Sequence, residues 1–148
     1  HVVWIWDSDD GTQADRVRLY VNGTRYSDYS ASRALSSGDQ SDINNSGRDF
    51  VIGDSAVGDS KLFDGYLAET IFIDGGTEDF TANNFGETKN GVWVPKDPSS
   101  LTFGSNGFHL KYEDASNLGN DSSGNNNDFT AAGLGTDHQV LDSPTFGS

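Results

Sequence analysis

Oxygen-bearing side chains gather in one Gly/Asn-rich stretch, DASNLGNDSSGNNND, in the last third of the chain. Ca²⁺ accepts about six to eight hard oxygen ligands in flexible geometry, so such a loop could hold it. The alternative is that Asp and Asn serve as turn residues, because they tolerate unusual backbone angles. Both interpretations involve the same residues, namely Asp114, Asp121, Asn125 and Asp128.

A second acidic group, Asp7, Asp9 and Asp10, follows the first apolar segment. Its spacing does not match that of an EF-hand loop. We expect an acidic loop at this position, with turn formation as the alternative to cation binding.

Exposed aromatic rings could stack on the faces of sugars, as they do on other apolar surfaces. Trp4 and Trp6 share one face of a predicted strand with Val2, which also suits an ordinary sandwich core, and the core is favoured. The candidate carbohydrate-binding residues are Trp4, Trp6, Tyr66 and Trp93.

Three Asn-x-Ser/Thr triplets fit the acceptor pattern for N-glycosylation. Such triplets arise often by chance in a chain rich in Asn and Ser, and an acceptor in a tight turn is cramped. The candidate acceptors are Asn22, Asn44 and Asn120.

Residues suited to catalysis do not form a recognisable set. The chain has no cysteine, and none of its histidines, His1, His109 and His138, has an evident partner for nucleophilic chemistry. Glu69 and Asp74 fall on opposite faces of a predicted strand, so they cannot form the carboxylate pair about 5 Å apart that retaining glycosidases use. We therefore predict a protein that is not an enzyme and requires no cofactor, with Ca²⁺ as the candidate ligand.

The longest apolar segment, Phe63–Asp74, predicts a central strand that is covered on both faces and belongs in a layered β structure. Glu69 lies on the more apolar face of this strand. If that face is buried, the carboxylate needs a cationic or hydrogen-bonding partner, and a structural ion pair is favoured over a catalytic role.

Alternation of apolar and polar residues predicts further strands at His1–Trp6 and Arg16–Asn22. In the second of these, Val17, Leu19 and Val21 are expected to face inward, with Arg16, Arg18 and Tyr20 outward. Asn22-Gly23 is typical of a tight hairpin turn, so a returning strand is expected at Thr24–Tyr26. Other short strands are expected at Ala31–Leu35, Asp49–Gly53, Gly107–Tyr112 and Phe129–Ala132, and Glu78–Thr88 could hold a helical turn with Thr81 as its N-cap.

Composition limits the possible functions. The chain has 148 residues, a hydrophobic fraction of 33% and 18 Gly, which favours a thin β-sandwich with many loops over a helical bundle. Its net charge of −14 argues against nucleic acid as a partner, and no segment predicts insertion into a membrane. The sequence begins at His1 within a predicted strand, so we expect a processed product or a segment of a longer protein.

Four motifs in order, HVVWIWDSDDGTQADRVRLYVNG, FDGYLAETIFIDG, FGETKNGVWVPK and DSSGNNNDFT, resemble a laminin-G-like, concanavalin A-like jelly roll. The version that they resemble most is found in structural proteins of phage and environmental virions. In that family several strands precede the first motif and are missing here, whereas the segment Leu110–Thr130 resembles what usually opens the sandwich. The resemblance therefore implies an antiparallel β-sandwich that strands from a neighbouring copy could complete. The alternative is that the missing strands lie upstream in the full gene and were cut away.

We therefore expect one jelly-roll domain over residues 1–142 and a linker or tail over 143–148. The expected function is a structural building block of an extracellular or virion fibre or filament, whose partners are other copies of itself. The alternative is a lectin-like carbohydrate-binding module, with glycans as partners and Ca²⁺ as a candidate requirement, used for attachment. The expected location is the extracellular space or the virion surface.

Overall fold

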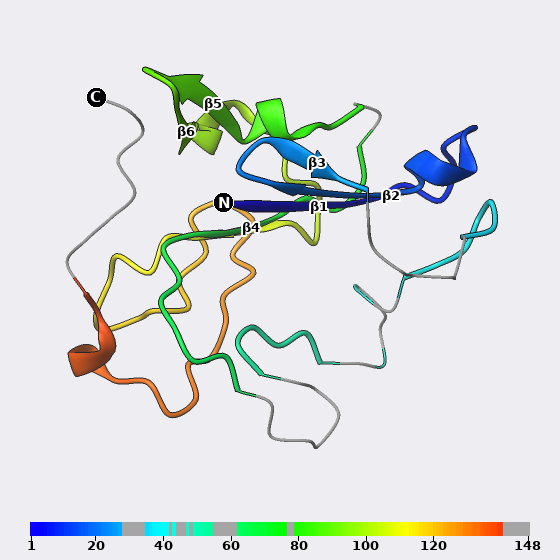
Figure 1. The fold of residues 1–148 in the computed structure, drawn as a ribbon. Helices are drawn as coiled ribbons and strands as arrows, with labels where there is room; N and C mark the ends of the chain where they lie inside the picture. Colours follow the sequence, from blue (N-terminus) through cyan, green and yellow to red (C-terminus); the bar gives the residue numbers. More distant parts are fainter. Residues whose placement is uncertain are drawn as a thin grey trace. The chain divides into compact units, whose positions relative to one another are not determined.

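A computed structural model of the chain shows short β-strands and single 3₁₀ turns joined by long connections (Figure 1). The described residues form two compact units: those up to 41 together with 79–100, and those between 43 and 76 together with 101–140. Among them there is no α-helix, which confirms the mostly β class, and no sandwich or jelly roll is evident. The structure describes residues 1–27, 35–41, 43, 47, 49–54, 62–76 and 79–140.

The first unit contains a three-stranded antiparallel sheet of β1 (Val2–Trp6), β2 (Val17–Val21) and β3 (Thr24–Tyr26), with β2 in the middle. Asn22 and Gly23 join β2 to β3 with φ angles of 47° and 78°. Positive φ at both residues matches the twist of the strands that they connect. The predicted hairpin and its returning strand are confirmed.

A second hairpin in the same unit pairs β5 (Gly86–Lys89) with β6 (Val92–Pro95). Its turn also has positive φ at both residues, since Asn90 and Gly91 have φ angles of 50° and 79°. An Asn-Gly turn therefore sets the position of each of these two hairpins.

Thr81 begins the 3₁₀ turn η2 (Ala82–Asn84), as the sequence predicted. The Thr81 hydroxyl accepts a hydrogen bond from the Asn83 backbone N–H at 3.3 Å. In return the Asn84 side chain accepts one from the Thr81 N–H at 2.8 Å, which completes a reciprocal cap. The other 3₁₀ turns are η1 (Gln13–Asp15), η3 (Pro98–Ser100) and η4 (Thr136–His138).

In the second unit, β4 (Thr70–Phe72) pairs antiparallel with β7 (Phe108–Leu110). Four phenylalanines pack around this pair, and Phe108 and Phe129 come closest, with ring centroids 4.7 Å apart in an edge-to-face arrangement. Phe50 contacts the rings of Phe72, Phe108 and Phe129. Leu110 and Phe108 are the most deeply buried apolar side chains here, so this cluster is the core of the unit.

Several predicted strands are wrong in extent or absent. The central strand expected at Phe63–Asp74 is a strand only over Thr70–Phe72, because its partner β7 is equally short and a ladder extends only as far as both strands pair. Asp49–Gly53 and Phe129–Ala132 are irregular, and of Ala31–Leu35 only Leu35 is described. The predicted tail, 143–148, lies outside the described residues, and the single-domain assignment stays a prediction.

Trp93 on β6 lies against two glycines of the first unit, Gly23 and Gly86. A Cβ at Gly86 would lie 2.5 Å from Cζ2 of the Trp93 ring, which leaves no room for a methyl group. We expect Gly86→Ala to lower the free energy of unfolding by about 1–3 kcal/mol, the usual cost of overpacking. Urea unfolding followed by tryptophan fluorescence measures it.

Gly11→Ala is the matched control for this prediction. No atom lies within 4 Å of a Cβ built at Gly11, and its φ is not positive. Alanine there should leave stability unchanged or raise it by up to about 1 kcal/mol by restricting the unfolded chain. Equal urea midpoints for the two variants would show that the Trp93 contact does not constrain the fold.

Candidate functional site

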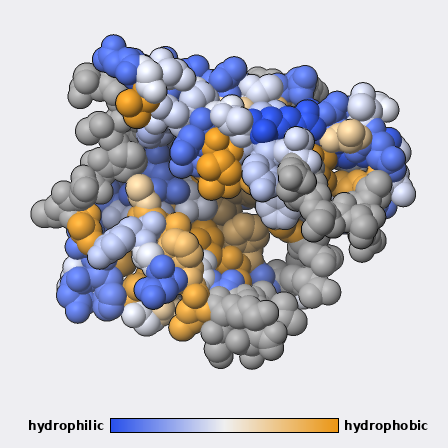
Figure 2. Space-filling view, in the orientation of Figure 1, coloured by the Kyte–Doolittle hydropathy of each residue, from blue (hydrophilic) through white to orange (hydrophobic). Residues whose placement is uncertain are grey.

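One face of the β1-β2-β3 sheet carries an apolar surface. Cross-strand pairing places Trp4 opposite Leu19 and Val2 opposite Val21, and Leu19 also faces Tyr26 of β3. Facing pairs share one side of a sheet, so these side chains form a continuous patch. Figure 2 shows hydrophobic residues reaching the surface among hydrophilic ones. We call this patch the apolar face: Val2, Trp4, Trp6, Leu19, Val21 and Tyr26.

The apolar face is open to solvent although its residues are those that the alternation of apolar side chains would assign to a core. Val2, Trp4, Trp6, Val21 and Tyr26 are all exposed, whereas Leu19 at the centre is half-buried. The Trp6 indole N–H donates to the Asp39 carbonyl at 3.3 Å, which orients that ring at the margin of the patch. An exposed contiguous patch of this kind marks an interaction site more often than a scattered apolar residue does.

The opposite face of the same sheet is the covered one. Val3 and Arg18 are buried there, and Arg18 stands opposite Ile5 in the ladder. The prediction that Val17, Leu19 and Val21 face inward and Arg18 outward is therefore wrong. Alternation separates the two faces of a strand but does not say which of them is covered.

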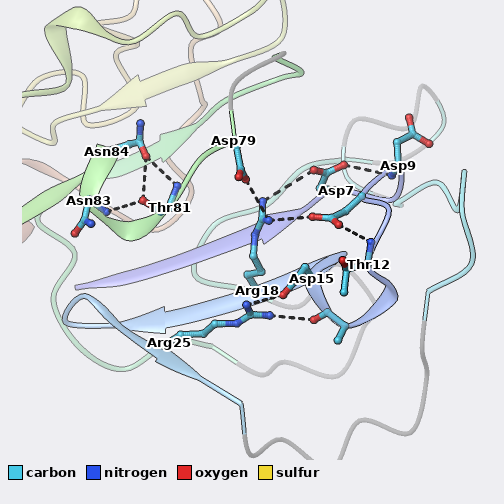
Figure 3. A network of polar contacts seen from close by, with 12 residues as sticks. Asp7, Asp9, Thr12, Asp15, Arg18, Arg25, Asp79, Thr81, Asn83 and Asn84 are labelled. Carbon is cyan, nitrogen blue, oxygen red and sulfur yellow. Dashed lines mark hydrogen bonds and ion pairs between the residues drawn. The ribbon is translucent and has the colours of Figure 1, made fainter.

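Arg18 is buried because three carboxylates meet its guanidinium (Figure 3). Nη1 lies 3.2 Å from Asp10 Oδ2 and 3.3 Å from Asp79 Oδ1, and Nη2 lies 4.0 Å from Asp7 Oδ2. Nε is buried without a hydrogen-bond partner in the described part of the chain. Arg18 thus pairs with two of the three carboxylates, Asp7 and Asp10, that the sequence offered for cation binding.

The predicted aromatic sugar-binding residues do not form a single platform. Trp4 and Trp6 lie together on the apolar face, and Trp93 belongs to the same unit. The Trp93 ring packs on glycines and its indole N–H donates to His1 Nδ1 at 3.2 Å. Tyr66 is highly exposed and belongs to the second unit. Within the first unit, the structure therefore brings Trp4 and Trp6 together on one face.

Asp121 is the centre of the loop that the sequence offered for calcium. Its Oδ1 accepts the backbone N–H groups of His109 and Ser123 at 2.8 and 2.9 Å. Its Oδ2 accepts the Ser123 hydroxyl and the Asn127 N–H at 2.8 and 3.0 Å. Burial opposes ionisation of the Asp121 carboxyl, but these four hydrogen bonds outweigh it and hold its pKa below the ordinary value.

The other predicted metal ligands have different partners. Asp128 accepts the Asp121 backbone N–H at 2.8 Å, and the Asn125 amide donates to the carbonyls of Gly104 and Gly107. Asp114 instead accepts both the N–H and the hydroxyl of Ser116, and these bonds lower its pKa. In the described residues, no three His, Cys, Asp or Glu side chains converge in a way that could hold a metal ion.

Glu69 has the partner that its position required. Its Oε1 lies 2.8 Å from His109 Nε2, and the Phe103 ring stacks on the His109 imidazole with an interplanar angle of 9°. Glu69 therefore has a hydrogen-bonding partner, and its structural rather than catalytic role stays a prediction. The sequence offers no evident partner for His109, because Glu69 lies forty positions away and no local signal links the two.

The candidate glycosylation acceptors differ in their surroundings. Asn22 is exposed but its Oδ1 accepts from the N-terminal ammonium group of His1 at 2.9 Å. Asn120 is exposed beside the buried Asp121. Asn44 lies outside the described residues.

Comparison with protein-family models, with curated proteins and with solved structures gives no match. Within the part of the chain that the structure describes, no helix has the length and hydrophobicity that a membrane span requires. The geometry of the two units therefore carries the functional argument.

Proposed function

We propose that this chain is a non-enzymatic structural building block of an extracellular or virion fibre, in which neighbouring copies complete each other's β-sandwich. The observation that carries the proposal is that most strand edges in the described part of the chain have no neighbouring strand. Among the described strands, β2 alone has a strand on each side. β7 is not such an open edge: β4 lies on one side, and on the other the His109 backbone N–H and C=O are bound by Asp121 Oδ1 and the Ser122 N–H.

Open edges favour assembly for a physical reason. Each unpaired edge presents backbone N–H and C=O groups that another strand can bind. Two-stranded sheets are also marginally stable alone, so β4-β7 and β5-β6 would gain from added strands. A jelly roll completed in trans is the architecture that we propose, with head-to-tail pairing giving a filament.

Light scattering over a concentration series, with electron microscopy of the same samples, tests this function. We expect the mass to rise with concentration and elongated particles to form. A monomer of constant mass over the whole series would contradict the proposal.

A glycan-binding module is the second candidate, and the exposure of Trp4 and Trp6 on one face supports it. Aromatic side chains can stack on apolar sugar faces. A glycan array probed with and without a chelator tests this alternative, including its calcium requirement. Binding by a strictly monomeric protein would place it above the structural role.

A further inference from the structure

The apolar face bears no charged side chain, although the chain as a whole has a net charge of −14. Copies of such an acidic protein repel one another over most of their surface. An uncharged apolar patch is where two copies can approach without bringing carboxylates together. This charge distribution favours a second copy over a basic partner, which would need acidic contacts within the patch.

The polar groups of the patch are too few to orient a sugar. Sites for small polar ligands usually combine apolar walls with several convergent hydrogen-bonding groups. The Trp6 indole N–H already donates to Asp39, which leaves the Trp4 indole N–H on β1 and the Tyr26 hydroxyl on β3, with the Thr24 hydroxyl on the same side of the sheet. Because β2 lies between β1 and β3, these groups do not converge on one point. The patch has the composition of an inner sandwich layer.

The area of the patch is enough for a weak specific interface. The exposed fractions are 67% for Val2, 59% for Trp4, 37% for Trp6, 42% for Val21 and 50% for Tyr26. Since a large aromatic side chain can bury about 150–250 Å², the face offers on the order of 500 Å². Two such faces together would bury roughly 1,000 Å², which is the lower limit for a specific interface.

We propose that the apolar face packs against the same face of a second copy, so that two copies supply the two layers of one β-sandwich. Sheets that pack in this way lie about 10 Å apart with their strands rotated by about 30°. Identical patches in contact imply a two-fold axis, so this contact closes as a dimer and head-to-tail growth of a filament takes place through the strand edges. The inference rests on the proposed function and names the surface through which assembly begins.

Trp4→Lys, studied by sedimentation velocity over a concentration series, tests the inference. A lysine in place of Trp4, an exposed residue of the patch, places two positive charges in a dry interface, and loss of a buried aromatic anchor typically costs about 2 kcal/mol or more. We therefore expect self-association to weaken by at least about 30-fold. Tyr66→Lys, which changes an equally aromatic and still more exposed residue of the other unit, should leave it unchanged.

Salt provides a second readout. Screening reduces the repulsion between acidic copies, so high salt should strengthen association of the unmodified chain. Val21→Lys, on the same face, should reproduce the effect of Trp4→Lys, which guards against a folding defect peculiar to one variant. Circular dichroism of each variant establishes that it is folded.

The outcomes separate the inference from the proposed function. Association that Trp4→Lys and Val21→Lys leave intact would overturn the inference and leave edge-to-edge assembly standing. A monomer under all conditions would overturn both. Glycan binding by a monomer that is lost in Trp4→Lys would overturn the inference and assign the face to a sugar.

Discussion

Asp121→Asn is expected to lower the free energy of unfolding by about 2–4 kcal/mol. An asparagine has one acceptor oxygen where the carboxylate has two, so one pair of donors would face an amide N–H₂ group. A buried donor left without an acceptor costs about 1–3 kcal/mol, and a hydrogen bond to a charged group contributes more to stability than one to a neutral group. Urea unfolding at neutral pH measures the loss.

Asp114→Asn is the matched control in the same segment. Both of its side-chain hydrogen bonds, from the Ser116 N–H and hydroxyl, go to one oxygen, Oδ1. An asparagine can keep that oxygen in place, so we expect little change in stability. Equal losses in the two variants would show that the arrangement of donors around Asp121 is not what stabilises this loop.

The same site gives a pH dependence with a definite sign. The hydrogen bonds to the Asp121 carboxylate hold its pKa in the folded chain below the ordinary value of 3.8, so folding favours its ionised form. The resulting stability is present above pH 3.8 and is lost as the pH falls through the folded pKa. Unfolding midpoints measured from pH 6 downward should fall more steeply for the unmodified chain than for Asp121→Asn.

Local chemistry allowed a good part of the first unit to be predicted. The Asn22-Gly23 hairpin and the Thr81 cap depend on residues within four positions of one another, and both are confirmed. The length of the segment Phe63–Asp74 could not be predicted in this way. Its pairing depends on a partner strand more than thirty residues away, and apolar character alone does not supply hydrogen bonds.

The candidate sites show the same limit. An oxygen-rich loop has the same sequence pattern whether its oxygens accept backbone N–H groups or bind a cation. The sequence therefore identified Asp121 as a candidate residue but not the backbone N–H groups that donate to it. An Asp followed two residues later by Ser is a local signal of such a turn. The exposure of Trp4 had no local signal, because alternation is equally strong for a covered and an open face.

Arg18→Met is expected to lower the free energy of unfolding by about 1–3 kcal/mol. Methionine can replace the aliphatic stem packed beside Ile5, but it leaves the carboxylates of Asp7, Asp10 and Asp79 without the guanidinium that they share. Removing one partner of a fully buried pair costs about 3–5 kcal/mol. The loss here should be smaller, because Asp79 is largely exposed and can be hydrated instead.

Two comparisons distinguish this charge effect from a packing defect. Arg25→Met breaks the pair with Asp15, in which both side chains are partly exposed, and should cost less than about 1 kcal/mol. High salt screens repulsion among the remaining carboxylates, so the deficit of Arg18→Met should shrink in urea unfolding at high salt. A loss of stability that salt leaves unchanged would mean that packing of the aliphatic part of the Arg18 side chain, and not its charge, stabilises this face.

The buried Arg18 Nε has no hydrogen-bond partner in the described residues, and this already opposes burial of the arginine. Arg18→Met removes that penalty, which also limits the expected loss of stability.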